Sequence, residues 1–205
     1  MHVVVAVEMS TQPFKSFKFD GILGLGLQGL SLSRKFSTLE VLGASSLLPS
    51  PRFGVFLTEG EDGEESEISL GGADSRRHLG PLHWAPVVMP ERGYWLVEIA
   101  AVRVGGRPLA ACASGGCRGV VDTGTSHWGV PAPYDTEVAS LLTTPAGDLQ
   151  DCRQASAPEV EIELKGFTLT LQPSNYMRKL PLREGIVVGS KLGVALPSNG
   201  TEAAP

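Results

Sequence analysis

Residues 120–126 read Val-Val-Asp-Thr-Gly-Thr-Ser. The two β-branched residues predict the end of a strand, and the glycine predicts a tight turn directly after it. Asp122 therefore stands where a strand meets a turn, and a rigid segment presents its carboxylate. Thr123 and Thr125 can fix that turn, because hydroxyl side chains commonly bond to neighbouring backbone groups. The stretch predicts a carboxylate that is held in place for chemistry, and it occurs once in the chain.

The composition is that of a packed and turn-rich protein. Of the 205 residues, 42% are hydrophobic and 19% are charged, which suits one large β domain or two smaller lobes. The 25 glycines and 15 prolines, together with short apolar runs, favour a mostly β architecture with few helices. The net charge is −5 and Lys and Arg form no cluster, so we expect no binding of nucleic acid.

Short apolar runs along the chain predict one strand after another. Residues 30–47 are the exception, because their apolar side chains recur at helical spacing. Residues 159–164 and 167–171 predict a hairpin that turns at Lys165-Gly166 and has a solvated outer face. The acidic run at residues 59–67 predicts a solvated hairpin tip. Further strands are expected at residues 3–7, 17–25, 53–57, 67–70, 82–88, 94–99 and 102–106, the last of which ends in a turn.

The cysteines and histidines are the candidates for disulfide bonds and metal binding. Cys112 and Cys117 can close a small disulfide loop in an oxidising compartment, which leaves Cys152 without a partner. No histidine stands at metal-ligand spacing from a cysteine or an acidic residue, so we expect no metal site. The histidines are His2, His78, His83 and His127.

Several other motifs accompany the Asp-Thr-Gly stretch in a definite order. Residues 19–26 read Phe-Asp-Gly-Ile-Leu-Gly-Leu-Gly, residues 68–74 contain Gly-Gly-Ala-Asp, and residues 93–95 read Gly-Tyr-Trp. Residues 111–126 join the close cysteine pair to the Asp-Thr-Gly stretch. This order resembles the pepsin family of aspartic proteases, in which DTGTS is typical of the second lobe. The resemblance is specific over about residues 3–131.

The resemblance implies an all-β, pepsin-like bilobal fold, of which this chain is a fragment. Residues 1–80 would form the C-terminal part of the first lobe, and residues 81–205 would form the second lobe. Residues 186–190 and 191–195 resemble the segment that braces the second catalytic loop and the last strand. This sequence has no counterpart of the family residues between these two segments. It also has no counterpart of the first catalytic loop, of the flap or of the usual partner of Cys152.

The chemistry implied by the resemblance is that of an aspartic endopeptidase without a cofactor. Two carboxylates share one proton in such enzymes, because like charges held close together cannot both ionise. One carboxylate takes a proton from a water that attacks the peptide carbonyl, while the other carboxyl group donates a proton. Asp122 would be the catalytic carboxylate of this chain. The same resemblance assigns substrate binding to Thr123, Gly124, Thr125, Val120 and Tyr94.

The resemblance further implies polypeptide substrates, acidic pH and a monomer when the protein is complete. It also implies the secretory pathway, with an extracellular, vacuolar or lysosomal address. Residues 1–8 are apolar, but they lack the basic residues of a signal peptide and are too short to span a membrane. Asn199 begins an N-glycosylation pattern, which matters only in that pathway.

The sequence leaves three alternatives to an ordinary protease. Two chains could pair and each donate Asp122, as in retroviral proteases, although the chain carries motifs of both lobes. A binding module could keep part of a peptide cleft without the pair of carboxylates. Residues 24–29 match Gly-x-Gly-x-x-Gly, but a dinucleotide fingerprint belongs to a βαβ unit, whereas this chain predicts successive strands.

Overall fold

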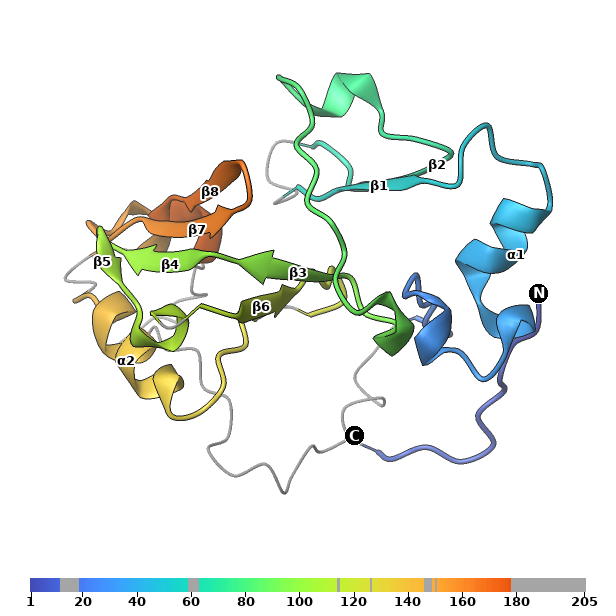
Figure 1. Cartoon of the computed structure of the whole chain (residues 1–205), viewed down its shortest axis with the longest axis horizontal. Helices are drawn as coiled ribbons and strands as arrows, with labels where there is room; N and C mark the ends of the chain where they lie inside the picture. Colours follow the sequence, from blue (N-terminus) through green and yellow to red (C-terminus); the bar gives the residue numbers. More distant parts are fainter. Residues whose placement is uncertain are drawn as a thin grey trace. The chain divides into compact units, whose positions relative to one another are not determined.

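The computed structural model shows a strand-rich chain with few helices, as the composition predicted (Figure 1). It consists of two compact units, one formed by Met1–Leu96 with Val120–Thr123 and the other by Val97–Gly119 with the described residues from Gly124 to Met177. None of the helices described is long and apolar enough to cross a membrane. The lobe boundary at residues 80 and 81 stays a prediction. The structure describes residues 1–11, 19–58, 63–113, 115–125, 127–145, 149 and 151–177.

The first unit contains an antiparallel strand pair. Strand β1 (Phe53–Phe56) pairs with β2 (Glu67–Leu70), with Phe53 opposite Leu70. Both predicted strands are thereby confirmed. The connection between them carries the acidic run, and the Thr58 hydroxyl donates to the carbonyl oxygen of Glu64 at 2.9 Å within it. Residues 59–62 of the predicted hairpin tip lie outside the described part of the chain.

The helical prediction for residues 30–47 is confirmed only in part. The chain forms two short 3-10 turns, Gln28–Leu30 and Arg34–Phe36, followed by helix α1 (Thr38–Ala44). The Ser37 hydroxyl begins α1 as an N-cap by accepting from the backbone N–H of Glu40 at 3.5 Å. The helix ends before Ser46, whose φ of 55° lies in the left-handed region and cannot continue it.

Three strand predictions in the first unit are wrong. Residues 3–7 form no strand and Val7 is 99% exposed, because among the described residues no strand lies beside them to supply hydrogen bonds. Residues 19–25, the described part of the 17–25 prediction, are likewise irregular, with Ile22 77% exposed. Residues 82–88 contain a single bridge residue at Val87 in place of a strand.

The second unit is built on a four-stranded antiparallel sheet with the order β5-β4-β7-β8. Gly105 and Gly106, with φ of 56° and 77°, make the turn after β4, and Gly166, with φ of 92°, makes the predicted turn of the second hairpin. The register places Leu164 opposite Phe167, which confirms that hairpin. The strands are β4 (Ala101–Val104), β5 (Arg107–Pro108), β7 (Val160–Leu164) and β8 (Phe167–Leu171).

The core of the second unit joins this sheet to helix α2 (Tyr134–Leu142), which the sequence analysis did not predict. Val138 of α2 and Val160 of β7 are fully buried, so the two elements hold each other in place. On the outer strand β8, Thr168 and Thr170 are exposed, as expected for a solvated face. The buried core residues are Val102, Val104, Leu109, Cys112, Val130, Val138, Leu142 and Val160.

A smaller cluster surrounds Cys152, which is a free and buried thiol. It packs with Ala155 and with Met177, which follows the short helix α3 (Pro173–Tyr176). The segments predicted at residues 186–190 and 191–195, and the pattern at Asn199, lie outside the described residues.

Candidate active site

Strand β6 leads into the Asp-Thr-Gly loop. β6 (Cys117–Val120) pairs with β3 (Leu96–Ile99), and the next residue, Val121, donates its N–H to the carbonyl oxygen of Trp95 at 2.9 Å. Asp122 follows this hydrogen bond directly, and a turn begins at Thr123. The residues from Asp122 to Thr125 are all exposed. The chain therefore presents the carboxylate to solvent from a backbone that is anchored one residue earlier.

Trp95 anchors the loop through both its backbone and its side chain. Its indole Nε1–H donates to the carbonyl oxygen of Leu25 at 2.8 Å, while its own carbonyl oxygen accepts from Val121. The indole also makes an edge contact with Phe53 of β1, with ring centroids 5.7 Å apart. Trp95 thereby joins three segments that are distant in sequence. The Gly-Tyr-Trp motif predicted no role for Trp95, although a half-buried indole N–H normally needs a partner.

Two glycines allow the segment at residues 19–30 to pack on the Gly-Tyr-Trp motif. A Cβ on Gly29 would collide with the carbonyl oxygen of Glu91, and Gly93 has a φ of 84° and faces the backbone of Leu30. The N–H of Leu27 donates to the carbonyl oxygen of Gly93 at 2.8 Å. The glycine-rich pattern thus serves close backbone packing. It leads into a three-residue 3-10 turn and not into an α-helix, which excludes the dinucleotide-binding alternative.

A disulfide between Cys112 and Cys117 lies at the start of β6, with the two Cα atoms 5.1 Å apart. This pairing confirms the prediction from the cysteine spacing. Cys112 belongs to the buried core of the second unit, so the bond ties the beginning of β6 to that core.

The predicted substrate-binding residues fall into two groups. Tyr94, just before β3, and Val120, the last residue of β6, lie in the first unit and are 46% and 50% exposed. Thr123 belongs to the same unit, whereas Gly124 and Thr125 belong to the second. Val120 is the last residue of β6, two residues before Asp122, and Tyr94 lies two residues before β3, while the roles of all five residues stay predictions. No group of three metal-ligating side chains occurs within the described ranges.

The sequence of this chain is similar to those of known aspartic proteases. The family model of eukaryotic aspartyl proteases matches residues 1–186. Gastricsin of Mus musculus is 33% identical over 165 residues, which cover 78% of this chain and 42% of that protein. Cathepsin E of Oryctolagus cuniculus is 33% identical over 178 residues, covering 83% of this chain and 43% of that protein. Gastricsin of Homo sapiens is 32% identical over 167 residues, covering 78% and 42%.

A strand-rich chain with an Asp-Thr-Gly loop after a strand is typical of aspartic proteases. The chain belongs to the eukaryotic aspartyl protease family, in its pepsin-like branch. It spans less than half the length of the curated relatives that it matches.

Proposed function

We propose that this chain is part of an aspartic endopeptidase and that Asp122 is the catalytic carboxylate it contributes. One observation carries the proposal. In a chain of this family, Asp122 is exposed directly after the backbone hydrogen bond that joins Val121 to Trp95. A carboxylate held in this way can meet a peptide bond without first ordering its own backbone.

The proposed reaction needs two carboxyl groups. The ionised one accepts a proton from water, and the water oxygen attacks the carbonyl carbon of the peptide bond. The protonated one donates to the amide nitrogen as the C–N bond breaks. The two titrate as a pair. The 205 residues contain one Asp-Thr-Gly, so the proposal requires a second carboxylate from polypeptide outside these residues or from another chain.

The proposal also covers the residues that contact the substrate and the compartment in which the protein acts. Thr123, Gly124 and Thr125 would meet the substrate backbone, and the half-exposed side chains of Val120 and Tyr94 would form apolar walls. The substrate would be an extended polypeptide, and the complete protein would act as a monomer. The disulfide supports an oxidising compartment, which in this family means the secretory pathway, outside the cell or in a lysosome or vacuole.

The test is the substitution Asp122→Asn in a protein that contains both catalytic loops. The amide cannot accept a proton from water, so we expect cleavage of a quenched peptide at acidic pH to fall by at least about a thousandfold. The melting temperature should not change. Asp135→Asn, on α2 of the second unit, is the matched control and should retain activity. Cleavage at the parent rate by Asp122→Asn would refute the assignment.

The single Asp-Thr-Gly also supports a second candidate, in which two chains pair and each contributes Asp122. Sedimentation and turnover of the purified chain separate the possibilities. A dimer whose turnover rises with the square of concentration would support pairing. A monomer that binds peptides without cleaving them would instead support a binding module.

A further inference from the structure

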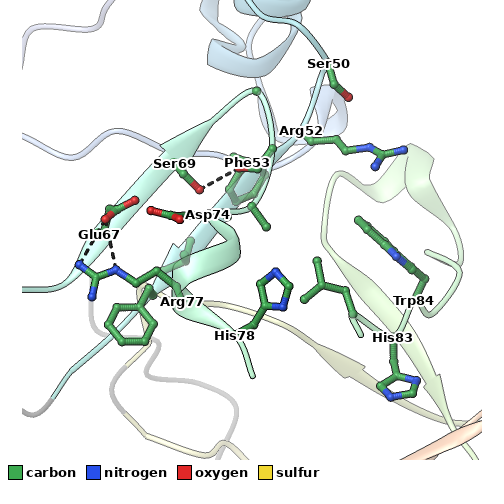
Figure 2. A pocket seen from close by; sticks show the side chains of 17 residues that line it. Ser50, Arg52, Phe53, Glu67, Ser69, Asp74, Arg77, His78, His83 and Trp84 are labelled. Carbon is green, nitrogen blue, oxygen red and sulfur yellow. Dashed lines mark hydrogen bonds and ion pairs between the residues drawn. The ribbon is translucent and has the colours of Figure 1, made fainter. Parts of the chain in front are cut away.

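A groove lies on the first unit, next to the strand pair β1–β2. Its volume is about 390 Å³, and none of its lining residues belongs to the proposed catalytic or substrate-binding set. Phe53, Leu82 and Trp84 supply apolar surface. Figure 2 shows Arg52 extending toward Trp84 beside this surface. The groove therefore combines an apolar lining with a guanidinium group.

The acidic residues that line the groove already have cationic partners. Arg77 contacts Glu67 at 3.4 Å and Glu64 at 2.6 Å. Arg76 forms an ion pair with Asp74 at 2.6 Å, and its hydrogen bonds lower the pKa of Asp74 to about 2. Asp74 and Glu67 each form an ion pair with a neighbouring arginine. Arg52 differs from these two arginines.

Arg52 forms no ion pair with any residue that the structure describes. Its guanidinium carbon lies 5.2 Å from the centroid of the Trp84 ring, and Trp84 is itself 69% exposed. A cation–π contact orders the guanidinium without using its N–H donors. The planar fork of an arginine matches a carboxylate, with which it can form two parallel hydrogen bonds. The charge of the groove therefore favours a carboxylate ligand.

We propose that this groove binds the C-terminal residue of a peptide, with the carboxylate on Arg52 and an aromatic or aliphatic side chain against Phe53, Leu82 and Trp84. A terminal residue suits the groove because its carboxylate and its side chain are attached to one Cα. Both can then reach their partners without ordering a long linker. Each hydrolysed peptide bond creates one new C-terminal carboxylate, so a product of the proposed reaction has this chemistry. The binding itself does not depend on that activity.

The experiment measures fluorescence anisotropy of a labelled hexapeptide ending in phenylalanine, added to the full purified chain. The free acid should bind at least about tenfold more tightly than the same peptide with a C-terminal amide, as a charge-assisted pair predicts. Arg52→Gln should remove this preference. Arg52→Lys should retain part of it, because the charge remains while the fork is lost. Arg34→Gln, at another exposed arginine of the first unit, should behave as the parent.

Three outcomes would overturn the proposal. Equal binding of the acid and the amide by the parent chain would exclude a carboxylate site. An Arg52→Gln chain that melts as the parent and keeps the preference would exclude Arg52. An amide peptide with an internal glutamate that binds as tightly as the free acid would exclude a site for the terminal residue. The anisotropy measurement requires no turnover, so failure of the proposed protease activity leaves this result unaffected.

Discussion

At the scale of single residues, Trp95 best shows how one side chain supports the candidate site. Its indole bonds to Leu25, its ring touches Phe53, and its carbonyl oxygen holds Val121. Asp122 is the next residue along. The carboxylate therefore depends on contacts made by a side chain that has no place in the proposed chemistry.

The substitution Trp95→Phe tests that dependence. Phenylalanine keeps an aromatic ring but loses the N–H that bonds to Leu25, so we expect the free energy of unfolding to fall by about 1 kcal/mol. Hydrogen exchange of the Val121 amide should become faster, because the carbonyl oxygen that holds it is less well fixed. Urea unfolding and amide exchange measure the two effects. The exposed Trp84→Phe is the control, and equal exchange at Val121 in both variants would contradict the role of Trp95.

At the scale of elements, the arrangement of the first unit depends on close backbone contacts as well as on strands. The segment around Gly29 packs against Glu91 and Gly93 with no room for a side chain on the glycine. Gly93 lies two residues before Trp95, whose indole N–H donates to the carbonyl oxygen of Leu25. A glycine far from Asp122 in sequence thus contributes to the surroundings of the Asp-Thr-Gly loop.

Gly29→Ala should therefore be costly, whereas Gly21→Ala, where a Cβ would meet nothing within 4 Å, should not. The added methyl group must displace the backbone at Glu91, so we expect a loss of about 1–3 kcal/mol in the free energy of unfolding. Urea denaturation of both variants provides the comparison. Equal midpoints for the two would show that the segment is free to move away from Glu91.

At the scale of the whole molecule, the chain exposes large apolar side chains. Ile22 is 77% and Leu23 is 62% exposed, and Val3, Val4 and Val5 are exposed to a similar degree. Neighbouring exposed apolar side chains such as Ile22 and Leu23 favour association. The curated relatives are more than twice as long as the part that this chain matches.

Replacing Ile22 and Leu23 together by threonine should lower the fluorescence of a bound apolar dye and reduce self-association of the chain. The exposed side chains contribute little burial, so the melting temperature should change little. Dye titration, sedimentation and thermal unfolding test these points. A large drop in melting temperature would show instead that the two side chains are packed in solution.

The sequence by itself predicted features that depend on neighbouring residues. The hairpin at Lys165-Gly166 and the turn at Gly105-Gly106 were predictable, because glycine permits the required φ angles and alternation marks the flanking strands. The motif order identified the family, and the cysteine spacing predicted the disulfide.

Tertiary structure alone decided which apolar runs became strands and what surrounds Asp122. Residues 3–7 carry a strand pattern, but a strand forms only where another strand completes its hydrogen bonds, and the pattern contains no information about that partner. The bond from Trp95 to Leu25 joins residues 70 positions apart. The groove beside Arg52 likewise depends on segments that meet only in the folded chain. Local sequence specifies turns and periodicity, whereas contacts between distant segments depend on how the whole chain packs.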